Sequence, residues 1–207
     1  MNHLSNDGPV VGVLRQVVRY VLLGLLWAVT SLPVITFGAA TTAMLFTAET
    51  SIHKDAGKWQ FVFWKSFRRE FKQATLLSLI AAVFAAGLVL AGYVLSAKDL
   101  ADGLAVLLLV YFVLTFSWLQ LWFGYLSKFN DTIGKLMANT FGILFGSFLW
   151  VLLLAAIGGA AILGAYAAVR SGSLLLLLIP GAYAMLASLV LRRIFKKYIP
   201  VEQAVAQ

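Results

Sequence analysis

Residues 73–97 have the sequence QATLLSLIAAVFAAGLVLAGYVLSA, which contains no Asp, Glu, Lys or Arg. A helix needs about 20 mostly apolar residues to cross a hydrocarbon core of about 30 Å. Lipid offers no hydrogen bonds to an unpaired backbone, so a segment that crosses it must be helical. The sequence therefore predicts a membrane-spanning helix at this position.

Three further stretches are uncharged and long enough to span a bilayer: residues 103–127, 136–169 and 171–191. The short segments AKDLADG at 97–103 and RSGS at 170–173 separate them, which predicts two helical hairpins across residues 74–191. As one helix, residues 136–169 would be about 50 Å long. We therefore expect this helix to be tilted, or to begin with a turn or two along the membrane surface.

The composition leaves no room for a soluble domain beside these helices. Hydrophobic residues make up 62% of the chain and charged residues 12%, whereas soluble domains carry about 25% charged residues. We therefore expect a single membrane domain over residues 1–207. The absence of cysteine excludes disulfides and thiolate sites. The net charge of +8 comes from basic clusters between apolar stretches, without any nucleic-acid-binding motif, so nucleic acid is not an expected partner.

Residues 20–48 are uncharged, but Pro33 interrupts them and Gly38 follows. They form either one kinked span or two short helices joined near Pro33, that is, a hairpin over residues 17–48. Loops rich in Lys and Arg stay in the cytoplasm. The hairpin places all but two of the sixteen basic residues there, whereas a single kinked span puts the N-terminus outside. We favour the hairpin. A cleaved signal peptide is disfavoured because the apolar run exceeds a typical signal core.

The predicted fold is therefore all-α. It is a polytopic membrane bundle of six helical segments, a short N-terminal hairpin followed by four full spans, with both termini in the cytoplasm.

The segment WQFVFWKSFRREFKQ at residues 59–73 predicts an amphipathic helix on the cytoplasmic face. Its aromatic residues recur at helical spacing and its basic residues fill the other side: Phe61, Trp64, Phe67 and Phe71, and Lys65, Arg68, Arg69 and Lys72. Such a helix lies at the headgroup boundary and is attracted by anionic lipid. It serves as a topology anchor in one interpretation, and as a docking surface for a cytoplasmic partner in the other.

Polar groups within predicted membrane segments are candidates for function: Thr36, Thr41, Thr42, Glu49, Ser117 and Gln120. The threonines flank Pro33, where their hydroxyls can bond freed backbone groups. For Glu49, the main expectation is an ion pair at the membrane interface with Arg15 or Arg19, and the alternative is a proton relay. For Gln120, one turn after Ser117 in an aromatic-rich span, the main hypothesis is an interhelical hydrogen bond and the alternative is the lining of a small cavity.

Small residues in the spans predict close helix packing. Gly142 and Gly146 form a GxxxG match, and residues 157–168 are rich in Gly and Ala. Packing within the bundle is the main interpretation, and homodimerisation through the same faces is the alternative.

No sequence feature points to catalysis. The chain has only two histidines, His3 and His53, and lacks hydrolase, metalloprotease, P-loop and dinucleotide-binding motifs. We therefore predict a non-enzymatic protein without a cofactor or metal. No convincing inverted repeat or set of buried charges indicates an ion-coupled transporter.

Three segments together resemble the YesL family of small bacterial membrane proteins. They are LLWAVTSLPVITFGAATTAM at 25–44, FVFWKSFRREFKQATLLSLI at 61–80 and LVLRRIFKKYIP at 189–200. Between about residues 81 and 187 the likeness is in hydropathy only. The resemblance implies the bacterial plasma membrane. It also implies an accessory role in sugar uptake or sensing, because family members are often encoded beside carbohydrate ABC-transporter components and sensor proteins. It identifies no binding residues.

From this we expect a partner of a carbohydrate ABC-transport or sugar-sensing system, with the lipid bilayer and transporter or sensor subunits as its contacts. A small-molecule channel or carrier is one alternative, and a membrane scaffold or chaperone is another. A continuous cavity touching Gln120 and the Thr41–Thr42 region would favour the channel or carrier, whereas a tightly packed bundle would favour the partner role.

Overall fold

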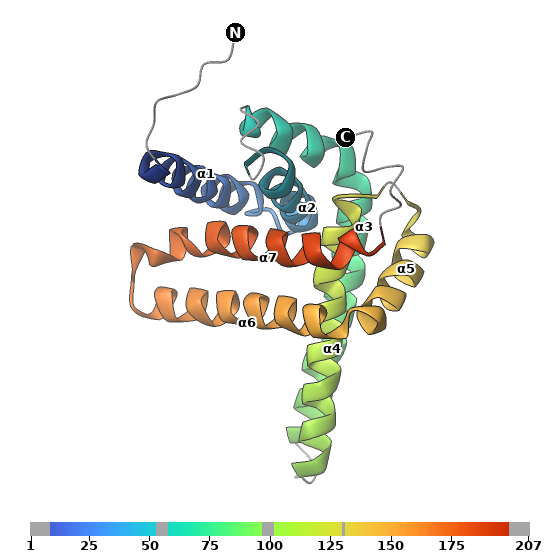
Figure 1. Ribbon diagram of the computed structural model, residues 1–207. Coiled ribbons are helices and arrows are strands. Elements are labelled where there is room, and N and C mark those ends of the chain that lie inside the picture. The colour runs from blue at the N-terminus through green and yellow to red at the C-terminus, as the bar shows by residue number, and fades with distance from the viewer. Residues whose placement is uncertain (1–8, 53–57, 97–101, 130, 199–207) are drawn as a thin grey trace.

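The computed structural model describes residues 9–52, 58–96, 102–129 and 131–198, and every regular element in these ranges is helical (Figure 1). The α-helices are α1 (Pro9–Thr30), α2 (Phe37–Thr47), α3 (Trp59–Ser96), α4 (Asp102–Leu126), α5 (Ile133–Gly146), α6 (Phe148–Arg170) and α7 (Ile179–Lys196). Short 3₁₀ helices η1 (Val34–Thr36) and η3 (Leu174–Leu177) and the π-helical turn η2 (Ala48–Ile52) lie between them.

Four helices are long and apolar enough to cross a membrane: α1, α3, α4 and α6. The all-helical prediction is thus confirmed in its main feature. Two of the spans differ from expectation. α1 begins at Pro9 and has 22 residues, so the first arm of the predicted hairpin is not short. Residues 171–191 are not one helix, because Gly172 has a positive φ, the η3 turn follows, and Pro180 marks a new helix start.

The long predicted segment 136–169 is also divided, at Ser147. Its φ of −134° and ψ of 36° are not helical, and α5 ends there as α6 begins. Adjacent Gly and Ser residues are a common cause of helix kinks, and Gly146 precedes Ser147 here. In place of one tilted helix, or one helix that begins with a turn or two along the membrane surface, the segment begins with a separate helix of 14 residues.

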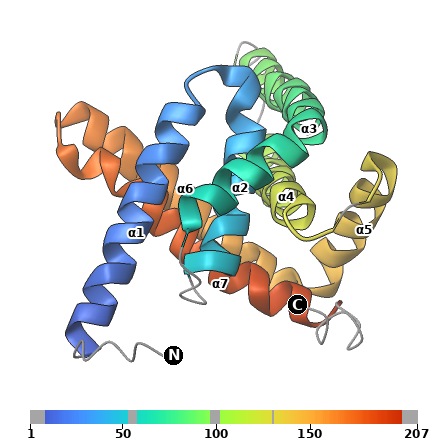
Figure 2. The same cartoon turned by 90° about the horizontal axis from the view of Figure 1, so that it is seen from above.

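Hydroxyl groups complete the backbone hydrogen bonding where α1 and α2 meet. The Thr36 hydroxyl donates to the carbonyls of Thr30 and Pro33, and the Thr30 hydroxyl donates to the carbonyl of Leu26. Pro33 cannot donate a backbone hydrogen bond, which favours a break in the helix here. α1 and α2 run in opposite directions from this turn (Figure 2).

α2 lies at the centre of the molecule and is buried around its whole circumference. A helix that is apolar on all sides is one that other elements surround, and α2 is made of small and apolar residues. It packs most extensively against α3, and also contacts α1, α4 and α7. At Gly38, an added Cβ would lie 2.5 Å from the Ala74 carbonyl oxygen and 2.9 Å from the Phe123 ring. Only glycine permits this approach.

α3 joins the predicted surface helix at 59–73 and the following span in one helix of 38 residues. Its first turns run across the upper part of the molecule, and the rest descends beside α4 (Figure 1). α4 is seen nearly end on in Figure 2, whereas α1, α6 and α7 lie across that view. The descending part of α3 and α4 therefore stand at a steep angle to α1, α6 and α7, and the helices do not share one bundle axis.

A second close contact between helices involves Gly24 of α1 and Gly181 of α7. A Cβ on Gly24 would lie 2.6 Å from the Gly181 nitrogen, and one on Gly181 would contact the Tyr20 carbonyl oxygen. The prediction that the GxxxG match packs within the bundle is wrong for Gly142, which faces open space, while homodimerisation through this face stays a prediction. Gly146 faces the Tyr198 hydroxyl. The glycines that matter for helix packing are thus far apart in the sequence.

Replacing Gly24 with Leu should lower the melting midpoint in detergent, because overpacking costs about 1–3 kcal/mol and the neighbour here is backbone. The matched change Gly142→Leu should leave the midpoint unchanged or slightly higher, since Leu is the better helix former. Equal midpoints for the two variants would contradict the crossing.

Candidate functional site

A cavity of about 740 Å³ lies where α1, α2, α3, α4, α6, η3 and α7 meet. Among the residues that the structure describes, no Asp, Glu, Lys, Arg or His lines it. Its lining contains few side chains with polar atoms: Trp27, Ser31, Thr41, Ser78, Gln120 and Tyr183. The remainder of the wall is aliphatic, aromatic or glycine. The site is therefore a largely apolar chamber with a small number of hydrogen-bonding groups.

Small side chains leave the space for this cavity. α6 contributes Gly158, Ala161 and Ala165 at helical spacing, so they share one face. α3 contributes three alanines to the lining as well. The Gly- and Ala-rich segment 157–168 was predicted to pack closely against other helices. Part of its small-residue face borders the cavity instead.

Gln120 reaches the cavity from α4 and is 8% exposed. Its Oε1 accepts a hydrogen bond of 3.1 Å from the Tyr183 hydroxyl of α7, whereas its Nε2 has no partner among the described residues. Gly158 makes room for the amide, since a Cβ there would lie 2.6–2.8 Å from its atoms. Both expectations for Gln120, an interhelical hydrogen bond and a cavity lining, therefore hold together. Ser117 does not line the cavity, and its hydroxyl donates to the Val113 carbonyl within α4.

Thr41 of α2 is a second polar residue of the lining. Its hydroxyl donates to the Phe37 carbonyl at 2.8 Å and accepts from the Trp27 indole at 3.1 Å. This bond joins α1 to α2 beside the cavity. Thr42 is fully buried, does not line the cavity, and has no hydroxyl partner among the described residues. Of the threonines near Pro33, Thr41 alone belongs to the lining.

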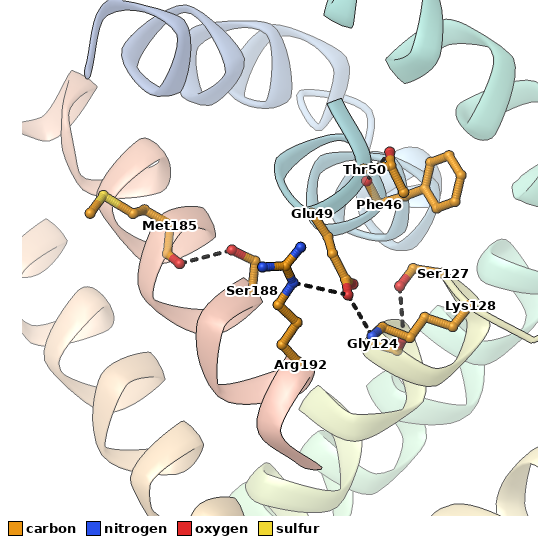
Figure 3. Close-up of polar contacts among 9 residues, drawn as sticks. All are labelled: Phe46, Glu49, Thr50, Gly124, Ser127, Lys128, Met185, Ser188 and Arg192. Carbon is orange, nitrogen blue, oxygen red and sulfur yellow. Dashed lines mark hydrogen bonds and ion pairs between the residues drawn. The ribbon is translucent and has the colours of Figure 1, made fainter. Parts of the chain in front are cut away.

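Glu49 lies outside the cavity, in the π-helical turn that follows α2. Its carboxylate is 2.6 Å from Lys128 Nζ and 3.7 Å from Arg192 Nε (Figure 3). The prediction of Arg15 or Arg19 as its partner is corrected here, because the cations that contact the carboxylate follow α4 and lie on α7. The Glu49 and Lys128 side chains are only 15% and 13% exposed. The cluster therefore connects the ends of three helices in a partly desolvated place.

The segment 59–73 packs against the core with a side that the sequence analysis did not single out. Its buried residues are Trp59, Phe63, Ser66 and Glu70. Among the predicted aromatic residues, Phe67 and Phe71 are partly buried, whereas Phe61 is 68% and Trp64 42% exposed. The basic residues Lys65, Arg68, Arg69 and Lys72 are exposed. The exposed surface thus combines two aromatic rings with the basic groups.

Although Arg69 is exposed, it makes contacts within the protein. Its guanidinium contacts the buried carboxylate of Glu70 and lies over the Phe46 ring, 5.1 Å from the ring centroid. The sequence analysis did not single out Glu70, because one acidic residue among several basic residues is typical of a solvent-exposed helix face.

Sequence reasoning also missed Tyr183, Gly158, Lys128 and Arg192 as partners of the singled-out residues. No local signal identifies them, because their partners are distant in the sequence. Within the described ranges, no group of three His, Asp or Glu side chains comes together as a metal site would require.

A family model described as a protein of unknown function, DUF624, matches residues 20–92. The match covers less than half of the chain. It contains the Pro33 turn, α2 and nearly all of α3, but not the helices that carry Gln120, Gly158 and Tyr183. No curated protein matches the chain, and no solved structure does.

Replacing Glu49 with Gln should destabilise the protein, because it leaves two partly buried cations without their carboxylate. We expect a loss of about 1–3 kcal/mol, below the range for fully buried pairs. Unfolding in detergent should be measured for Glu49→Gln, Lys128→Gln and the double variant. The double variant should lose less than the sum of the single losses. Additive losses would show that the two groups do not interact.

Proposed function

We propose that this chain is a non-enzymatic membrane protein that binds a small apolar or amphipathic molecule in the cavity beside Gln120. Ligand sites are typically concave, mostly apolar and about 300–1,000 Å³ in volume, with a few placed polar groups. The cavity of about 740 Å³ has these properties. Its contact with both Gln120 and Thr41 supports a molecule-binding role over a uniformly packed helix assembly.

The residues that line the cavity disfavour a sugar as the bound molecule. A sugar brings several hydroxyls, and each one buried without a hydrogen-bond partner costs about 1–3 kcal/mol. Most polar side chains of the lining already bond to other protein groups. An ion is also disfavoured, because no charged side chain among the described residues lines the cavity to compensate its charge.

The proposal includes membership in the YesL family and a place in the bacterial plasma membrane with both termini in the cytoplasm. The match over residues 20–92 supports the family proposal, because it contains the segments 25–44 and 61–80 that carry the resemblance. The basic residues near both ends of the described chain support the orientation.

A second candidate function is the accessory role in carbohydrate ABC transport or sugar sensing. The exposed pair Phe61 and Trp64 beside Lys65 and Arg68 supports it, because aromatic residues and Arg are enriched at protein interfaces. The two functions are compatible, since this surface and the cavity share no residue.

Filling the cavity tests the main proposal. Ala161 lines the cavity on α6, whereas its neighbour Ala160 is exposed and does not. Diphenylhexatriene, a hydrocarbon fluorophore, should bind saturably to the protein in nanodiscs, as measured by energy transfer from tryptophan. Ala161→Phe should weaken this binding at least about tenfold, because a bulky side chain that occupies the site removes buried apolar contact worth about 1.4 kcal/mol or more. Ala160→Phe should not. Equal binding by the two variants would contradict a cavity ligand.

The docking surface is tested by replacing Lys65, Arg68 and Lys72 with Gln while Arg69 is kept, since Arg69 pairs with buried Glu70. We expect normal membrane abundance and loss of co-purifying transporter or sensor subunits. Lys135, Arg193 and Lys196 are also exposed, and their replacement by Gln removes the same charge as a control. Undiminished co-purification in the first variant would leave the segment as a topology anchor.

A further inference from the structure

We infer that the cavity opens into the hydrocarbon of the bilayer, beside the hairpin of α3 and α4, and takes up a neutral lipid whose chain enters from the membrane. This inference rests on the proposed function and names the source, the route and the chemical class of the bound molecule.

The cavity is closed around its sides. Each helix around it packs against the next: α1 on α2, α2 on α3, α3 on α4, α4 on α6, α6 on α7 and α7 on α1. A ligand therefore enters at an end of this ring of helices and not through its wall.

The exposure of the lining changes along the helices and shows where the open end lies. On α2, Met44 is 1% exposed and Phe37 is 43% exposed. On α6, Gly158 is buried, whereas Ile162, one turn later, is 56% exposed. Large lining residues of η3 are exposed as well, and so are two alanines of α3. We call these exposed residues the mouth: Phe37, Ala82, Ala85, Ile162, Leu176 and Leu177. All of them are apolar.

Beyond the mouth, α3 and α4 continue as a hairpin that projects from the rest of the molecule (Figure 1). From Ala85 to the end of α3 at Ser96 the helix extends for about 16 Å. Residues 73–97 and 103–127 contain no Asp, Glu, Lys or Arg. Large apolar side chains are exposed on this part of the hairpin: Val89, Leu90, Val106 and Leu107. Such a surface is stable in hydrocarbon. The mouth at its base therefore lies within the hydrocarbon layer, and lipid chains are the molecules that reach it.

The charge and size of the ligand follow from the lining. Because no Lys, Arg or His among the described residues lines the cavity, a phosphate or carboxylate there would lose its hydration without gaining a cation. A hydroxyl or ester loses far less. The volume of about 740 Å³ holds about 25 methylene-sized groups, if each takes the share of a water molecule in the liquid. One complete lipid chain fits in this space.

Spin labels test where the mouth opens, and the chain has no native cysteine to interfere. Labels are attached to Ala85→Cys and Ile162→Cys at the mouth and to Lys65→Cys as a control. In nanodiscs, the mouth labels should collide with oxygen, which dissolves in hydrocarbon, and not with a water-soluble nickel chelate. The Lys65→Cys label should collide with the chelate. Collisions with the chelate at both mouth positions as frequent as at the control would overturn the inference.

A neighbouring pair on α6 tests whether the ligand occupies the mouth. Ile162 and Leu163 are both exposed, but only Ile162 lines the cavity. Binding of diphenylhexatriene should lower the oxygen collisions of a label on Ile162→Cys and leave those on Leu163→Cys unchanged. An equal effect of the fluorophore at the two positions would contradict entry at this mouth.

Oleyl alcohol and oleyl phosphate, which carry the same chain, test the class of lipid by competition with diphenylhexatriene. The alcohol should displace the fluorophore at a mole fraction in the nanodisc lipid about tenfold lower, because the phosphate loses its hydration at the site. Displacement by the phosphate at an equal or lower mole fraction would overturn the neutral class. Failure of Ala161→Phe to weaken diphenylhexatriene binding would instead overturn the proposed function itself, whatever the spin labels report.

Discussion

At Gly38 the backbone of α2 lies against α3, and an added Cβ would meet the Ala74 carbonyl and the Phe123 ring. In lipid the hydrophobic effect does not drive helices together, so close packing between small residues has to stabilise their contact. α2 is short and is buried on every side, which makes its contacts with α1, α3, α4 and α7 the centre of the molecule. The position of each of these helices depends on how closely it packs against α2.

The same short helix also builds the cavity. Phe37, Thr41 and Met44 recur at helical spacing on α2 and line the chamber, while Gly38 on a neighbouring face packs against α3. Small residues thus serve two purposes in one fold. Where two backbones meet, as at Gly24 and Gly181, they permit contact. Where a stripe of small residues on α6 lines the cavity, they leave space.

The sequence predicted the long apolar helices α3, α4 and α6 because a long uncharged run has only one stable structure in lipid. It did not predict the break at Ser147 or the late start of α7, since hydropathy does not register backbone geometry within an apolar run. The GxxxG match at Gly142 gave a wrong prediction of packing within the bundle for a related reason. Which face of an apolar helix packs depends on partners far away in the chain, and small residues occur on several faces.

The candidate residues show the same limit. Gln120 and Thr41 could be singled out because a polar group within a span is costly and therefore informative. Their partners, Tyr183 and Trp27, could not be identified, because the sequence does not say which helices cross. Glu49 was recognised as one half of an ion pair, but Lys128 and Arg192 become neighbours only when α4 and α7 converge on the end of α2.

The central claim is that the chamber beside Gln120 holds an apolar molecule in the membrane. Its most direct test is mass spectrometry of the organic extract from protein purified out of its own membrane in mild detergent, for the unmodified chain and for Ala161→Phe. The account predicts that a neutral, largely apolar lipid is enriched over the bulk membrane composition in the first extract and absent from the second. Two extracts that both match the bulk membrane would contradict it.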